Sequence, residues 1–267
     1  MKLRPVLGVV LRQFYLMRGS PTRVFPIFVW VALDIVVWGF LTRYLNGVSH
    51  SGLNFTRSLL GAVLFWDFFQ RIMQGVTMAF FEDVWSRNFL NVFATPLRIS
   101  EYLGGLILSS IATSACALVV MLLLATLVFG LPFFALGVTL LPFLLVLFLF
   151  GIALGVLACA LVLRFGPSSE WLVWPIPAVL SPFAGVFYPL ATLPAWMRYI
   201  GHVLPPSYVF ESLRALVSGH VPAPHALPIA TTLALLQILL AAWVFTRVHR
   251  HAVRTGLLAR YSAESMS

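Results

Sequence analysis

Long apolar segments dominate this chain and restrict its fold more than any other feature. An α-helix needs about 20 apolar residues to cross the hydrocarbon core of a bilayer. Charged residues make up only 9% of the sequence, against about 25% in soluble domains. The sequence therefore predicts an all-α integral membrane protein, a single domain over 1–267 with six transmembrane helices. The six predicted spans are 24–41, 59–81, 102–129, 139–163, 171–190 and 227–245.

The N-terminal segment, 1–20, is amphipathic rather than uniformly apolar. Leu7 and Leu11 share one helical face, whereas Arg12 lies on another. Charge interrupts the segment too often for a span, and no small-residue cleavage site of the signal-peptide type follows it. The pattern predicts an interfacial helix that lies along the membrane surface.

Basic residues are divided unequally between the two predicted sides of the membrane. With six spans, twelve of them fall on the side of the two termini and four on the other side. Positively charged residues favour the cytoplasmic side. Both termini, including the basic tail 246–267, are therefore predicted to be cytoplasmic.

The residue types also argue against several functions. All but one of the 17 basic residues are arginines, and the exception, Lys2, does not follow the glycine-rich turn that a P-loop requires. No ATP site of that kind is expected in this chain. Arginines dispersed at segment ends do not suggest nucleic-acid binding. Cys116 and Cys159 both lie in apolar segments, which indicates neither a disulfide framework nor a metal site.

Polar residues recur at helical spacing inside the predicted spans. Asp67, Gln70, Arg71 and Gln74 share one face of the second span, and Asp34 lies in the first. The i, i+4 spacing of Asp67 and Arg71 allows an ion pair. Ionisable groups at this depth should face protein or water rather than lipid. Two interpretations remain open: a structural pair that fixes helix packing, or part of a substrate or conformational pathway.

The segment 82–101 separates two apolar segments and is rich in charge. Its core, 87–94, is predicted to be a short amphipathic helix that ends at a Thr-Pro pair, because proline disfavours helical geometry in the residue before it. Such a helix can lie on the bilayer or dock into a partner protein. Docking is favoured, because Arg87 is the only cation on its polar face. The residues expected to contact the partner are Arg87, Asn88, Phe89, Leu90, Asn91, Phe93, Thr95 and Pro96.

The chain becomes rich in proline before the last span. Four prolines interrupt the fifth predicted span, which is therefore expected to be kinked. The region 192–219 then contains two short amphipathic pieces, each beginning at a proline, a favoured first residue of a helix. Neither can cross a bilayer, so they predict a re-entrant helical hairpin on the extracytoplasmic side. Its candidate functional residues are Pro194, Tyr208, Glu211 and Arg214.

Together these features resemble the membrane subunits, or permeases, of type-2 ABC exporters. The resemblance rests on the interfacial helix, the six spans and the first cytoplasmic loop, which is led by a glutamate and ends in Thr95-Pro96-Leu97. It also rests on the segment SPFAGVFYPLATLPAWMRYIGHVLPPSYVFESLRAL. Many family members have Gly-Thr-Leu-Glu ahead of the Thr-Pro pair, whereas this chain has Arg87-Asn88-Phe89-Leu90. That form is closer to the drug and nodulation-factor branch.

The resemblance implies that 82–101 contains a coupling helix seated in a groove of a separate ATP-hydrolysing subunit. It implies two such subunits, which carry ATP and Mg, and a second permease chain that forms a homodimer with this one. This chain would be a transport subunit, with no cofactor or catalytic residue of its own, in a prokaryotic plasma (inner) membrane. The expected substrate, moved outward, is amphiphilic: a drug, a lipid-linked saccharide or a lipo-oligosaccharide.

Two other functional classes remain as alternatives. An intramembrane enzyme could use Asp34, Asp67 and His202, but their spacing assembles neither a metal site nor a nucleophile–base pair. An ion-coupled secondary transporter could use Asp34 and Asp67 as proton sites. Such transporters often show an internal repeat, which is not apparent in this sequence.

Overall fold

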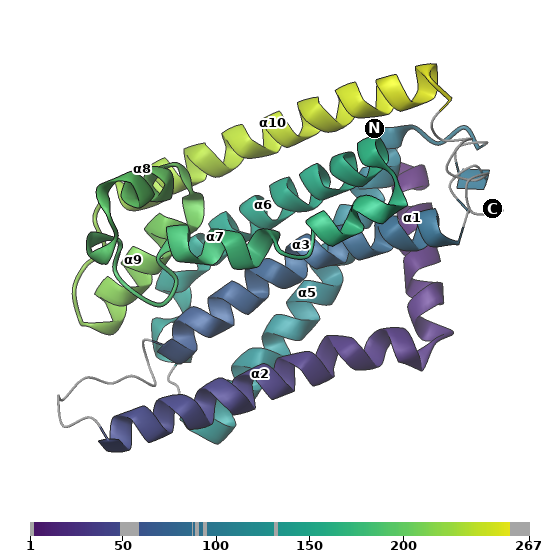
Figure 1. The fold of residues 1–267 in the computed structure, drawn as a ribbon. Coiled ribbons are helices and arrows are strands. Elements are labelled where there is room, and N and C mark those ends of the chain that lie inside the picture. Colours follow the sequence, from purple (N-terminus) through teal and green to yellow (C-terminus); the bar gives the residue numbers. More distant parts are fainter. Residues whose placement is uncertain are drawn as a thin grey trace.

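Helices form all the regular secondary structure in the part of the chain that the computed structural model describes (Figure 1). That part comprises residues 3–48, 59–86, 88, 91–92, 95–130 and 133–256. The predicted all-α class is confirmed. Within the described residues, four helical segments are long and apolar enough to cross a membrane: Phe28–Val48, Ile99–Phe129, Thr139–Phe165 and Ala226–Arg254.

The helices follow most of the predicted segments closely. The longer ones are α1 (Leu3–Arg18), α2 (Pro21–Val48), α3 (Gly61–Trp85), α5 (Ile99–Phe129), α6 (Phe133–Phe165) and α10 (Ala226–Arg254). α10 continues beyond the predicted end of its span, so the first part of the predicted basic tail is helical. The remainder of that tail, 257–267, lies outside the described residues.

α3 lies in the middle of the bundle, where it packs mainly against α5 and α6. Most of its side chains are buried. It is less apolar than the four segments above because it carries Asp67 and Arg71, although its 25 residues are enough to cross a bilayer. Its central position gives these ionisable groups protein surroundings rather than lipid. The total of six spans remains a prediction.

Two glycines allow α6 to lie close against α3. A Cβ atom added at Gly151 would lie 3.1 Å from the carbonyl oxygen of Phe69, and one at Gly155 would lie 3.1 Å from that of Met73. These contacts are one helical turn apart on both helices, as in small-xxx-small packing between membrane helices. The α3–α6 contact therefore depends on the absence of side chains at these positions.

Gly155→Ala is expected to destabilise the protein by about 1–3 kcal/mol, because the backbone oxygen of Met73 cannot move aside from the added methyl group. Thermal unfolding in detergent would measure the change. Gly8→Ala is the matched control, since a Cβ there meets nothing within 4 Å; alanine in an exposed helix is neutral or stabilising. Equal stability of the two variants would contradict close α3–α6 packing.

The predicted fifth span, 171–190, is not one continuous helix in the structure. It is divided among the 3₁₀ helix η2 (Pro167–Leu172), α7 (Ile176–Ala184) and the 3₁₀ helix η3 (Leu190–Thr192). α7 has 9 residues, about 14 Å at the helical rise, which is too short to cross alone. It ends at Gly185, whose φ of 60° is a left-handed conformation that favours glycine. The expected kink is therefore a break in the helix.

The two predicted short helices before the last span are present as α8 (Ala195–Val203) and α9 (Pro205–Val217). Figure 1 shows them at one end of the bundle, whereas α1 and the C-terminal ends of α3 and α10 lie toward the other. α1 runs across the direction of α2 and packs on α5 (Figure 1). This arrangement suits an interfacial helix at one membrane surface and a hairpin at the other; which surface is cytoplasmic remains a prediction.

Candidate functional site: a polar cavity and the end of helix α3

A cavity of about 730 Å³ lies between α1, α2, α3 and α5. Its polar and charged lining combines residues from all four helices. The polar residues predicted in the first two spans all line it: Asp34, Asp67, Gln70, Arg71 and Gln74. Four of these residues come from one face of α3, and Asp34 comes from α2. Whether these residues have a transport role remains a prediction.

The cavity follows α3 for much of its length. Asp67 and Glu82, both of which line it, are separated by about 22 Å at the helical rise. Gln13 and Met17 of α1 also line the cavity. It therefore extends from the level of α1 into the depth of the bundle.

Arg71 is the central charge of the cavity. It lies close enough to Asp34 and Asp67 to interact electrostatically with both carboxylates. Asp67 is buried, with 9% of its surface exposed, whereas Asp34 and Arg71 are half-buried. Asp67 and Arg71, which the i, i+4 spacing suggested as a pair, thus belong to a group of three charged side chains on two helices.

Several buried polar atoms of the lining have no hydrogen-bond partner among the described residues. They are Gln13 Nε2, Asp67 Oδ2 and Ser109 Oγ. Buried polar atoms in folded proteins are nearly always hydrogen-bonded to protein or ordered water. Three such atoms in one cavity indicate that it holds water or a polar ligand.

A second polar cluster joins three helices near the end of α3. Both Nη atoms of Arg12, on α1, donate to the carboxylate of Asp83, with Nη1 2.9 Å from Oδ2. Tyr102 of α5 donates its hydroxyl to the same Oδ2 at 2.7 Å. The Asp83 side chain is 0% exposed and that of Arg12 31%. The hydrogen bond to Asp83 raises the pKa of Arg12 above its ordinary value, so the guanidinium remains charged.

The same last turn of α3 is also hydrogen-bonded to η2. Trp85 donates its indole N–H to Oε2 of Glu170, in η2, at 2.8 Å. Asp83 and Trp85 thus connect the last turn of α3 to α1, α5 and η2. Nothing in the sequence indicated the link from Arg12 to Asp83 to Tyr102, because its members are separated by 71 and 19 residues.

The predicted coupling segment continues directly from this turn, and the structure describes part of it. The backbone N–H of Val92 donates to the carbonyl oxygen of Asn88 at 2.9 Å, which is a helical bond. Asn91, Thr95 and Pro96 are exposed. The other residues predicted to contact a partner lie outside the described residues: Arg87, Phe89, Leu90 and Phe93.

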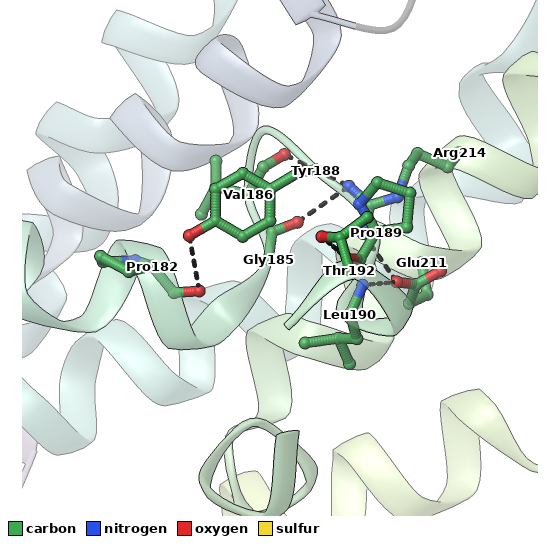
Figure 2. A network of polar contacts seen from close by, with 9 residues as sticks. All are labelled: Pro182, Gly185, Val186, Tyr188, Pro189, Leu190, Thr192, Glu211 and Arg214. Carbon is green, nitrogen blue, oxygen red and sulfur yellow. Dashed lines mark hydrogen bonds and ion pairs between the residues drawn. The ribbon is translucent and has the colours of Figure 1, made fainter. Parts of the chain in front are cut away.

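Glu211 and Arg214, predicted from the hairpin, hold the loop after α7 (Figure 2). Arg214 Nη1 donates to the carbonyl oxygen of Gly185 at 2.8 Å, and its Nη2 donates to Glu211 Oε1 at 3.0 Å. That same Glu211 oxygen accepts the backbone N–H of Leu190 at 2.7 Å. The two side chains therefore fix the loop 185–190 against α9.

The other two hairpin residues lie in different parts of the hairpin. Tyr208, on α9, donates its hydroxyl to the carbonyl oxygen of His202, on α8, at 3.0 Å. Pro194 is the residue that precedes α8. Their observed contacts are structural, and any further role for them remains a prediction.

A family model described as the ABC-2 type transporter matches residues 9–217. The chain belongs to this family. The match confirms the resemblance to type-2 ABC transporter membrane subunits, and it identifies the chain as a permease subunit of an ABC transporter. No curated protein matches the sequence.

The matched region of this ABC-2 permease contains both clusters described above. It begins within α1, before Arg12, and ends with α9. It therefore includes the cavity, the end of α3 and the network of Figure 2. Membership of the family implies an ATP-binding partner subunit and favours a transport subunit over the intramembrane enzyme and the ion-coupled transporter.

Proposed function

We propose that this ABC-2 permease is the membrane subunit of an exporter that moves an amphiphilic substrate outward, driven by ATP hydrolysis on a separate chain. One observation supports the proposal above the others: α3 lines the polar cavity and leads directly into the segment 86–98. A force applied to that segment by a partner would reach a wall of the cavity through the last turn of α3.

The hydrogen bonds at the end of α3 support the proposed coupling. The carboxylate of Asp83 is bonded to α1 and α5, and Trp85 is bonded to η2. Movement of the last turn of α3 would therefore move these elements with it. ATP and Mg would be bound by the partner, which we propose is present in two copies beside two copies of this permease, in a prokaryotic plasma membrane with both termini cytoplasmic.

Leu90→Ala and Phe93→Ala are expected to weaken binding of the ATPase subunit, or to uncouple hydrolysis from export. Either change would cost about 1–3 kcal/mol if the residue is an apolar anchor in a partner groove. Membrane insertion should be unchanged. The assay is a reconstituted complex in which partner retention, ATP turnover and substrate efflux are measured for each variant.

Leu141→Ala serves as the control, because Leu141 is a 65% exposed apolar residue on α6, away from the segment 86–98. Wild-type values for all three measurements in Leu90→Ala and Phe93→Ala would contradict the coupling-helix assignment. Efflux that needs an ion gradient but no ATP would instead support the ion-coupled class.

A further inference from the structure

We propose that the cavity binds a lipophilic cation, with Asp34 and Asp67 as the counter-charges of its cationic group. The proposal rests on the proposed function and names its substrate class: a drug-sized amphiphilic cation rather than a lipid-linked saccharide or a lipo-oligosaccharide. It rests on the charge, hydrogen-bonding capacity, shape and aromatic content of the cavity lining.

The formal charge of the lining is negative, although the chain as a whole carries +9. Among the described lining residues, the acidic ones are Asp34, Asp67 and Glu82, and the only basic one is Arg71. Arg71 interacts with both aspartates at once, so one cation is shared between two anions. A second positive charge in the cavity would complete their neutralisation, whereas an anion would add a further negative charge to a site that already has two carboxylates and one guanidinium.

Asp67 offers an oxygen atom that the protein leaves without a donor. Its Oδ2 is buried, lines the cavity and has no hydrogen-bond partner among the described residues. Leaving a buried acceptor unsatisfied is unfavourable, and more so where the group is charged. A ligand that brings a positive charge to this oxygen would recover that free energy.

The neighbouring hydroxyl groups also favour a positively charged ligand. Ser110 donates its hydroxyl to the carbonyl oxygen of Ile72 at 3.0 Å, and Thr113 donates its hydroxyl to that of Ser109 at 3.1 Å. Because each O–H is already used, these two residues have only lone pairs left to offer to the cavity. At these two positions the α5 wall therefore accepts hydrogen bonds, whereas the Ser109 hydroxyl, which has no partner among the described residues, can either donate or accept.

The rest of the lining suits the apolar part of such a ligand. Trp30 and Trp174 are 60% and 42% exposed, and they line the cavity with Met17 and Met78. Indole rings attract cations through their faces, and methionine adapts to varied shapes. A volume of about 730 Å³ also lies in the range of about 300–1,000 Å³ that is typical of sites for small molecules.

The test uses two probes of the same shape and opposite charge, tetraphenylphosphonium and tetraphenylborate. Binding of radiolabelled tetraphenylphosphonium to the purified full chain in lipid nanodiscs is measured without ATP or partner, with empty nanodiscs subtracted. We expect saturable binding that unlabelled tetraphenylphosphonium displaces, and no saturable binding of radiolabelled tetraphenylborate, which is measured in a separate sample because the two ions precipitate together. Equal saturable binding of tetraphenylborate, or no saturable binding of tetraphenylphosphonium, would overturn the proposal.

Variants separate recognition of the cation from folding. Asp34→Asn and Asp67→Asn should each weaken binding of tetraphenylphosphonium by about tenfold, the effect of roughly 1.4 kcal/mol. The double variant Asp67→Asn/Arg71→Gln removes a charge of each sign, so it should partly restore folding. The affinity should still fall, because the buried oxygen of Asp67 that has no partner among the described residues loses its charge. Glu170→Gln is the control: Glu170 lies outside the cavity, and the amide can still accept the Trp85 N–H. Wild-type affinity in a folded double variant would overturn the proposal.

The outcome is distinguishable from a failure of the proposed function. If no cation binds, the cation proposal alone fails, because partner retention and ATP-coupled efflux test the exporter assignment separately. Saturable cation binding by a chain that retains no ATPase subunit would overturn the exporter assignment and leave the cation site established.

Discussion

Arg12→Gln is expected to destabilise the permease by about 3–5 kcal/mol, because it leaves a buried carboxylate without its counter-charge. The Asp83 side chain is 0% exposed, and among the described residues it would retain only the hydroxyl of Tyr102 as a side-chain donor. Asp83→Asn should cost less. The Arg12 side chain that it leaves behind is 31% exposed and can turn toward water.

The measurement is unfolding of each purified variant in detergent, followed by tryptophan fluorescence. The double variant Arg12→Gln/Asp83→Asn should recover part of the loss, since it buries no unpaired charge. Arg4→Gln is the matched control, because Arg4 is an exposed arginine on the same helix. A larger loss for Asp83→Asn than for Arg12→Gln would contradict this account of the cluster.

Arg71→Gln is the second change expected to have a large effect, again about 3–5 kcal/mol. It removes the one positive charge that interacts with both Asp34 and Asp67 and leaves two neighbouring carboxylates in the bundle. Asp67→Asn should cost less, because Asp34 remains as a partner for Arg71. The double variant Asp67→Asn/Arg71→Gln should partly restore the amount of folded protein.

The amount of monodisperse protein recovered from membranes, together with its thermal midpoint, measures these effects. Gln70→Ala provides the control, since it alters the same face of α3 without changing a charge. Wild-type abundance and stability in both Arg71→Gln and Asp67→Asn would mean that water alone solvates these groups.

Local sequence patterns predicted much of the fold because they reflect local geometry. Amphipathic spacing identified α1, and prolines at favoured helix starts identified α8 and α9 within one or two residues. Helical periodicity also placed Asp67, Gln70, Arg71 and Gln74 on one face, and this face lines the cavity. Each of these features depends on residues within a few turns of one another.

Features that depend on contacts between distant segments were not predictable in the same way. Hydropathy treated 171–190 as one span, because it counts apolar residues and does not detect the left-handed turn at Gly185. The sequence placed Arg12 on a polar face and Asp83 beside the coupling segment, but no local pattern pairs them. Asp34 lies beside the α3 residues because of the way α2 packs in the bundle. The sequence does not specify how far α2 is shifted along its neighbours.

The two sides of the cavity differ in mechanical compliance. α3 packs closely against α6 at Gly151 and Gly155, and its last turn is hydrogen-bonded to α1, α5 and η2. α2 packs chiefly against α5 and makes little contact with α3. Sideways displacement of α2 would therefore alter the width of the cavity while the α3–α6 contact stays intact, so the cavity can change size at little cost to the core.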